Sequence, residues 1–451
     1  MTDAASAKPR DKDAIRARCT RFLTRQKAPT PKEMLQALAD EAGADEAVDN
    51  YGKGKLIENL EAEIASKLGK PAAVFMPSGT MVQTIALRLW CDRSGIPTVG
   101  LHPLSHLERN ESQAYRELHG LGASYLGDDS RQFRRKDIEA VAEQLGVIVL
   151  EMPLRPLGCV LLPWEEIAAI SALAKEREIP LHLDGARIWE SQPYYGKSFE
   201  EITSLFDSVY VSFYKGLAGI SGAALAGPKE LIDEARLWQH RYGGRLFQLY
   251  PYVLAARKGL RERLDLMPTF HQEIRRVADA IRGLPGVHVT PDPPQATSMH
   301  IQLPGTQENI EAAILDLAEE TGIWLLDRVF ASPVQGLAMT ELTAGAGTLG
   351  FPSDEIRGPE VVVVDAVHQG KATLAGAGII CPWASKLDEP AWLRLSLASA
   401  RYYPDLAAAL AEAGEANNGY RRVGALITAD DPAELADAEQ RILARRGNAP
   451  E

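Results

Sequence analysis

Three short segments of the sequence place reactive or ligand-binding side chains directly after apolar runs. Lys215 follows the alternating run VYVSFY and precedes a glycine. Asp184 follows the run PLHL, and a third run, AAVFM, leads through one proline into Ser78, Gly79 and Thr80. An amine, a carboxylate and a pair of hydroxyls in such places could together bind and activate a small polar molecule.

Lys215 has two interpretations when its own segment is considered alone. Most lysines are solvated charges at turns on the protein surface. A lysine that is partly removed from water has a lowered pKa instead, and its amine can act as a nucleophile or form a Schiff base.

Asp184 would end a buried strand, where a carboxylate is costly unless it meets a cation or a strong donor. Arg187, two residues beyond the following glycine, is one candidate partner. A protonated ring nitrogen of a cofactor is another. A helix or turn cap remains an equal alternative for this residue.

The segment Ser78–Gly79–Thr80 opens the predicted helix GTMVQTIALRLWC. The free N–H groups of a helix start, with two hydroxyls and a glycine that permits close approach, suit a phosphate group. The same residue types are also ordinary N-caps. No lysine-containing P-loop pattern follows, which argues against a nucleoside triphosphate.

Short apolar runs alternate with amphipathic helical segments over residues 45–260. This pattern is typical of parallel strands that are buried on both faces. We therefore expect an α/β fold whose large domain, 45–260, holds a mainly parallel sheet flanked by helices. Besides the run at 209–214, the expected strands include 72–76, 98–101, 123–126, 147–151 and 180–184.

Ligands of an open parallel sheet bind at the carboxyl ends of its strands, so Lys215, Asp184 and the Ser78 segment should share one crevice. Pyridoxal phosphate needs an amine for its aldehyde, a carboxylate for its pyridinium nitrogen and a helix start for its phosphate. The three segments together predict a site for this cofactor.

The flanking regions differ from the central one. Residues 1–44 are expected to form an N-terminal arm and a helix. Residues 261–451 should form a smaller α+β domain, because SMHIQL, NIEAAILDLAEETG and IWLLD indicate a strand, a helix and a strand. Within it, residues 331–390 are rich in Gly, Pro, Thr and Ala and are interpreted as an insertion.

Composition narrows the possible partners. Of the 451 residues 45% are hydrophobic and 24% are charged, and no apolar run is long enough to span a membrane. The N-terminus lacks the apolar core of a secretion signal, and the four cysteines show no metal-ligand spacing, so we expect a cytoplasmic protein without a metal. A net charge of −12 argues against nucleic acid as a main partner.

The motifs PSGTM, DGARIW, NYGKGKLIENLE and the lysine followed by GLAG together resemble the threonine aldolase / β-eliminating lyase family. Its members are pyridoxal phosphate enzymes of the aspartate-aminotransferase fold, fold type I. The resemblance extends from about residue 30 to residue 411, apart from the insertion. It implies a homodimer or homotetramer, with Tyr51 shared across the subunit interface near the substrate.

The resemblance also implies roles for individual residues. Lys215 would hold the cofactor as a Schiff base, Asp184 would pair with its pyridinium nitrogen, and Ser78, Gly79 and Thr80 would bind its phosphate. His106, in LSHLERNE, matches the histidine that stacks on the cofactor ring, with Glu111 at the matching downstream place. Arg187 and Arg394 match the pair that binds the substrate α-carboxylate, a task suited to bidentate arginine.

Several positions depart from the family pattern. In EMPLRPLG, Leu154 stands where threonine aldolases have a histidine near the substrate hydroxyl, and Arg155 replaces an asparagine. His106 or a water could still take the hydroxyl proton. Lys53, Lys55 and Arg155 would add positive charge near the site, which would suit an anionic substrate; alternatively, the two lysines are solvated loop charges.

The expected function is a carbon–carbon lyase of the threonine aldolase type, which cleaves a β-hydroxy-α-amino acid to glycine and an aldehyde. Cleavage of the Cα–H bond with Lys215 as base is the main alternative, leading to β-elimination, β-replacement or racemisation on an anionic amino acid. A non-catalytic binding protein of the same fold is a further alternative.

Overall fold

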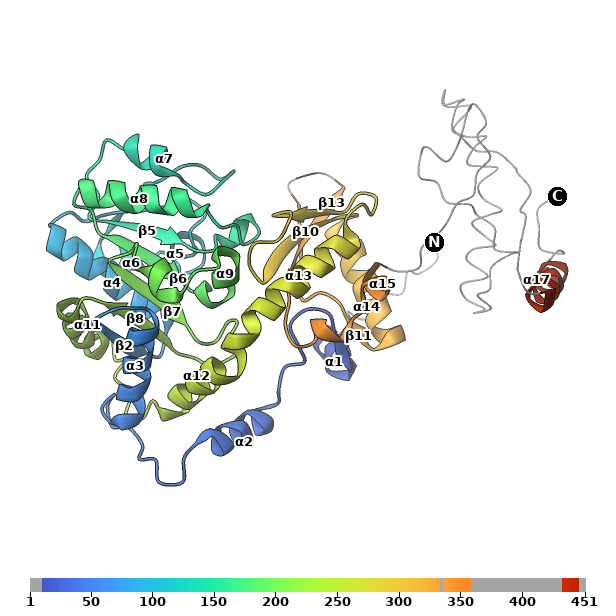
Figure 1. Cartoon of the computed structure of the whole chain (residues 1–451), viewed down its shortest axis with the longest axis horizontal. Helices are drawn as coiled ribbons and strands as arrows, with labels where there is room; N and C mark the ends of the chain where they lie inside the picture. The colour runs from blue at the N-terminus through green and yellow to red at the C-terminus, as the bar shows by residue number, and fades with distance from the viewer. Residues whose placement is uncertain (1–9, 333, 335, 358–431, 446–451) are drawn as a thin grey trace, which may run out of the picture. The chain divides into compact units, whose positions relative to one another are not determined.

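The structure is a computed structural model that describes residues 10–332, 334, 336–357 and 432–445 (Figure 1). The chain divides into two units, residues 1–358 and 359–451. In the described part of the second unit there is one helix, α17 (Pro432–Arg445), with Ala438 buried.

A seven-stranded sheet forms the centre of the first unit, with the strand order β2-β8-β7-β6-β5-β3-β4. All neighbouring strands from β7 to β4 pair in parallel, and only β8 runs antiparallel to its two neighbours. The predicted α/β fold with a mainly parallel sheet is confirmed. The strands are β2 (Ala72–Met76), β3 (Thr98–Leu101), β4 (Gly122–Tyr125), β5 (Val147–Glu151), β6 (Leu181–Gly185), β7 (Ser208–Ser212) and β8 (Ala223–Gly227).

Strand β8 was not apparent in the sequence. Its residues, AALAG, lack the β-branched and aromatic side chains that favour strands. Because β8 is antiparallel to both β2 and β7, those two strands point the same way. The carboxyl ends of β2, β5, β6 and β7 therefore lie at one edge of the sheet.

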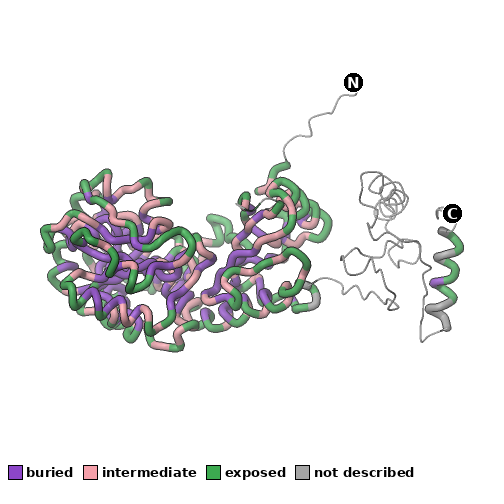
Figure 2. The backbone as a smooth tube through the Cα atoms, turned by 90° about the horizontal axis from the view of Figure 1, so that it is seen from above, coloured by how far each residue is buried: buried purple, intermediate pink, exposed green. Residues whose placement is uncertain are grey.

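Helices cover both faces of this sheet, and the alternation along β2 shows how the faces divide. Phe75 packs into the cluster that includes residues of α3 (Lys55–Lys67), α8 (Trp164–Glu176) and α12 (Tyr250–Arg263). Met76 packs on the opposite face with residues of α4 (Gly79–Ser94), α6 (Ala114–His119) and α11 (Lys229–Arg241). Figure 2 shows the resulting buried interior.

The other helices are shorter or lie outside these two layers. They are α1 (Lys12–Arg18), α2 (Pro31–Glu41), α5 (His106–Arg109), α7 (Arg135–Glu139), α9 (Ile188–Tyr195), α10 (Phe199–Thr203), α13 (Met267–Ile281), α14 (Gln307–Thr321) and α15 (Ser353–Arg357). None of the helices in the described ranges combines the length and apolar character that membrane crossing requires.

A second, four-stranded antiparallel sheet has the order β12-β13-β10-β9. Strand β13 lies inside the segment 331–390 that we expected to be an insertion, yet it pairs along its whole length with β10. The described part of this segment thus contributes a strand to the small sheet, and residues 358–390, where the rest of the expected insertion falls, lie outside the described part. The strands are β9 (His288–Thr290), β10 (Ser298–Pro304), β12 (Val329–Ala331) and β13 (Leu337–Thr343).

The N-terminal arm joins the region of this second sheet. Its strand β1 (Arg21–Phe22) pairs in parallel with β11 (Ile323–Trp324), and Ile15 of α1 lies in a buried cluster with Trp324. The strand expected in IWLLD is therefore only two residues long. The boundary expected at 260/261 falls within α12, three residues before its end.

Candidate active site

The carboxyl ends of β5, β6 and β7 surround a small cavity at one edge of the large sheet. It holds about 260 Å³ of empty space, part of it open to solvent. The lining residues include five of the predicted site residues, and the complete lining is His106, Glu151, Met152, Pro153, Arg155, Asp184, Ala186, Arg187 and Lys215.

Lys215 lies three residues beyond the end of β7, in the loop that leads to β8. The strand expected at 209–214 ends at Ser212, although the backbone N–H of Phe213 still bonds to the carbonyl of Gly222 at 3.1 Å. Among the described residues no carboxylate oxygen lies within 4.0 Å of the lysine amine, and its ammonium is 5.9 Å from the ring centre of Tyr214. Burial lowers the pKa of Lys215, and the positive charge of Arg187 lowers it further. The negative charge of Asp184 acts in the opposite direction but does not cancel these two effects.

Asp184 is buried on the central strand β6, in register with Glu151 of β5 and Tyr210 of β7. One of its carboxylate oxygens accepts the N–H of Ala186 at 3.1 Å. Burial raises the pKa of Asp184, while the nearby charge of Lys215 opposes that shift. The carboxylate and the amine therefore stabilise each other's charged forms.

Ser78, Gly79 and Thr80 form the junction between β2 and the sixteen-residue helix α4. The side chain of Ser78 makes no capping bond, so the first N–H groups of α4 have no side-chain cap from it. A Cβ atom on Gly79 would overlap the hydroxyl of Tyr210 and lie 3.0 Å from that of Tyr214. Only glycine fits here, and the helix start remains open to an anion.

His106 reaches the cavity from the start of α5. Its backbone N–H donates to the carboxylate of Glu151 at 2.8 Å, which connects α5 to the end of β5. Burial lowers the pKa of His106 to about 4, with further contributions from the charges of Lys215 and Arg187. The imidazole is therefore neutral at pH 7 and can accept a proton or a hydrogen bond.

The two arginines of the cavity differ in their partners. Arg187 makes no ion pair within 4.0 Å among the described residues. Arg155 donates to the buried carboxylate of Glu341 on β13 at 2.6 and 3.3 Å. The positive charge that we expected Arg155 to add is therefore neutralised by Glu341, a residue that nothing in the sequence connected with the site.

Glu111 lies in the loop after α5, close to the start of α4. It bonds to Thr80, but its second carboxylate oxygen is buried without a hydrogen-bond partner among the described residues. Burial and the charge of Asp184 raise the pKa of Glu111 to about 7. A buried acceptor of this kind is available to a hydroxyl or amine of a ligand.

Several predicted residues do not line the cavity in the described part of the chain, among them Ser78, Gly79 and Thr80 at the start of α4. Tyr51 is 54% exposed and packs edge-on against Phe247, with ring centres 5.4 Å apart. Lys53, in the same loop, and Lys55, the first residue of α3, are exposed too and do not line the cavity. Arg394 lies outside the described residues.

Comparisons with known proteins agree with this geometry. Residues 26–304 match the model of the beta-eliminating lyase family. A crystal structure of a putative L-allo-threonine aldolase from Listeria monocytogenes EGD-E is 35% identical, with a TM-score of 0.73 over 76% of this chain and 96% of that one. A putative aromatic amino acid beta-eliminating lyase/threonine aldolase from Exiguobacterium sp. 255-15 is 36% identical, with the same TM-score, over 76% of this chain and 98% of its own.

Curated sequences give the same picture at lower identity. A probable low-specificity L-threonine aldolase 2 of Arabidopsis thaliana is 27% identical over 61% of this chain and 79% of that protein. The match to an uncharacterized Caenorhabditis elegans protein spans 52% of that protein's length. The chain is an enzyme with the fold of type I pyridoxal phosphate enzymes, and it belongs to the threonine aldolase / β-eliminating lyase family.

Proposed function

We propose that this enzyme is a pyridoxal phosphate-dependent carbon–carbon lyase that cleaves a β-hydroxy-α-amino acid to glycine and an aldehyde. One observation carries the proposal: Lys215, Asp184 and the start of α4 lie at the same edge of the sheet. The likeness to threonine aldolases supports the choice of reaction.

The residues present fit the cofactor. Lys215 offers an amine without an ion pair among the described residues, Asp184 a buried carboxylate, and Gly79 a helix start without an obstructing side chain. When bound, pyridoxal phosphate supplies an aldehyde for an amine and a protonated ring that withdraws electrons from a bond at the α-carbon. No cluster of three His, Cys, Asp or Glu within the described ranges could hold a metal.

Each side chain then has a task that follows from its environment. Asp184, whose charged form the nearby Lys215 favours, would pair with the ring nitrogen of the cofactor. Arg187, without an ion pair among the described residues, would bind the substrate carboxylate, which fixes the substrate's orientation. Neutral His106 would cover the ring and accept the proton of the β-hydroxyl, since Leu154 is buried and does not line the cavity.

We also propose a homodimer or homotetramer. The side chains of Tyr51 and Phe247 are 54% and 59% exposed and lie in contact, and Val48, close to Tyr51 in the sequence, is 52% exposed. An exposed group of this kind suits a subunit interface. Sedimentation analysis of the wild type and of a Phe247→Asp variant would test it, and a monomeric wild type would contradict it.

The activity test uses purified protein, added pyridoxal phosphate and two substrates, L-threonine and L-allo-threonine. The proposal expects a visible imine absorption band and the release of glycine and acetaldehyde. Lys215→Ala should lose both, because no second amine replaces it in the lining of the cavity. Release of ammonia and a keto acid would instead support β-elimination, and the absence of any imine band would contradict the whole proposal.

A further inference from the structure

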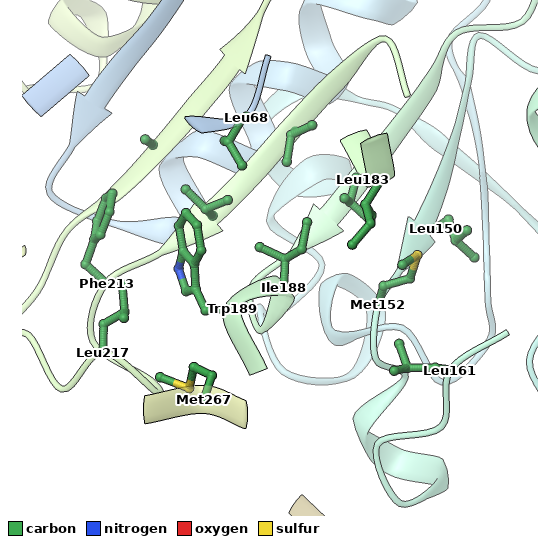
Figure 3. Close-up of a cluster of buried hydrophobic side chains, with 14 of the residues drawn as sticks. Leu68, Leu150, Met152, Leu161, Leu183, Ile188, Trp189, Phe213, Leu217 and Met267 are labelled. Atoms are coloured by element: carbon green, nitrogen blue, oxygen red, sulfur yellow. The ribbon is translucent and has the colours of Figure 1, made fainter. Parts of the chain in front are cut away.

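The loop that carries Lys215 is fixed at both of its apolar neighbours. Phe213 and Leu217 are buried in one hydrophobic cluster with Trp189 and Met267 (Figure 3). The N–H of Ala218 bonds to the carbonyl of Lys215 at 3.0 Å. The lysine is therefore presented on a short closed turn rather than on a free loop.

The two peptide groups on either side of Gly216 are each held by a side chain. The carboxylate of Glu190, on α9, accepts the N–H of Gly216 at 3.0 Å. The guanidinium of Arg263, the last residue of α12, donates to the carbonyl of Gly216 at 3.0 Å. Arg263 also donates to the side chain of Gln26 in the N-terminal arm. The helix α9, the end of α12 and the N-terminal arm are thus connected at Gly216.

Glu190 is an unusual residue for a purely structural contact. It is 3% exposed, and its second carboxylate oxygen is buried without a hydrogen-bond partner among the described residues. A half-satisfied buried carboxylate lowers stability compared with an apolar residue of similar size. The contact is also close, because a Cβ on Gly216 would lie 2.5 Å from the Glu190 carboxyl carbon.

We propose that Glu190 and Arg263 are positioning residues for Lys215, which hold the backbone on both sides of Gly216 so that the lysine amine points into the cavity. The inference rests on the proposed role of Lys215 in binding the cofactor. Glu190 accepts the N–H of the peptide group that follows Lys215, and Arg263 donates to the carbonyl of the next peptide group. Neither residue lines the cavity.

The test measures how fast the full-length, cofactor-free enzyme forms the imine band after pyridoxal phosphate is added, together with the pH at which that band titrates. Glu190→Gln keeps an acceptor oxygen for Gly216 and should react within about threefold of the wild type, whereas Glu190→Ala should be slower by about tenfold or more. Arg263→Lys and Arg263→Ala should differ in the same way and provide a second test if Glu190→Ala does not fold.

Asp207→Ala is a matched control. The carboxylate of Asp207 also accepts a backbone N–H, from Leu181 at 2.8 Å, but at the opposite edge of the sheet. This variant should keep the wild-type rate and titration while losing comparable thermal stability.

Three results would overturn the inference. The first is a wild-type rate in both alanine variants. The second is a Glu190→Gln variant as slow as Glu190→Ala, which would show that charge matters rather than the hydrogen bond. The third is an equal slowing in the Asp207 control. A wild type that forms the imine but releases no glycine would contradict the proposed reaction alone, so the two failures can be told apart.

Discussion

Glu341 and Arg155 form a two-point ion pair, with the arginine Nε 2.6 Å from one carboxylate oxygen and a terminal nitrogen 3.3 Å from the other. The pair joins the turn after β5 to strand β13 and so connects the large sheet to the small one. It also leaves Arg187 as the cavity's unpaired arginine among the described residues.

Arg155→Ala should lower the free energy of unfolding at pH 7 by about 2 kcal/mol, since the buried Glu341 loses its closest partner. Burial by itself would raise the pKa of Glu341. Its interactions with His300 and Arg155 outweigh that effect and hold the pKa of this carboxyl well below its ordinary value. The ion pair therefore contributes its full stabilisation at pH values above the pKa that Glu341 has in the unfolded chain. This contribution is lost as the pH falls through the lower pKa that Glu341 has in the folded protein. Urea unfolding at pH 7 and at about pH 3 should show a smaller difference at the lower pH; equal differences would contradict this account.

Gly79→Ala should reduce both stability and pyridoxal phosphate affinity, because its methyl group would overlap the hydroxyl of Tyr210. The loss of stability should be about 1–3 kcal/mol, the usual cost of overpacking. Adding Tyr210→Phe removes the overlapping oxygen and should recover part of the loss. Thermal unfolding and cofactor titration of both variants would measure this, and a fully stable Gly79→Ala protein would be inconsistent with the packing described.

Glu111→Gln should change how stability depends on pH in the cofactor-free enzyme. Burial and Asp184 raise the pKa of Glu111 from an ordinary 4.5 to about 7, so its ionisation opposes folding. The stability it contributes is complete below pH 4.5 and is lost as pH rises through about 7. Melting temperatures should therefore favour the variant more at pH 8 than at pH 5, whereas a constant gap would indicate that Glu111 does not titrate there.

Arg187→Lys should raise the KM for L-threonine by about tenfold to a hundredfold, because an ammonium cannot replace two parallel guanidinium bonds to a carboxylate. Arg155→Gln is the control, since Arg155 is already paired with Glu341 and should change KM much less. Steady-state kinetics of both variants would measure the effect. A larger KM change for Arg155 than for Arg187 would reverse the assignment.

The positions where these strands end could be predicted because each strand is a short apolar run that is followed directly by polar residues. Lys215, Asp184 and Ser78 each follow an apolar run that the structure confirms as a strand. Parallel strands bring their carboxyl ends to one edge, so the sequence also predicted that these residues share a crevice. The family resemblance was confirmed by the comparisons.

Other features depend on contacts between residues that are far apart in the sequence, and a local sequence pattern cannot reveal such contacts. Glu341 lies 186 positions from Arg155 in the sequence. It belongs to a Gly- and Thr-rich segment, and the strand there, LAMTELT, has too few large apolar residues for its alternation to be recognised. Glu190 lies on a helix, and nothing in its surroundings indicates that its carboxylate reaches Gly216. Strand β8 was not predicted because alanine and glycine, which make up most of it, have little preference for strands.

The reversed strand β8 also determines where the chain can vary in length. β8 begins at the edge that holds the cavity and ends at the opposite edge, where Gly227 pairs with Ala72. The connections that enter the parallel strands lie at that same distant edge. Insertions, tags or fluorescent labels at the turn after Gly227 would thus be separated from the chemistry by the full length of the strands. That edge is the place to extend or immobilise this enzyme without disturbing its cavity.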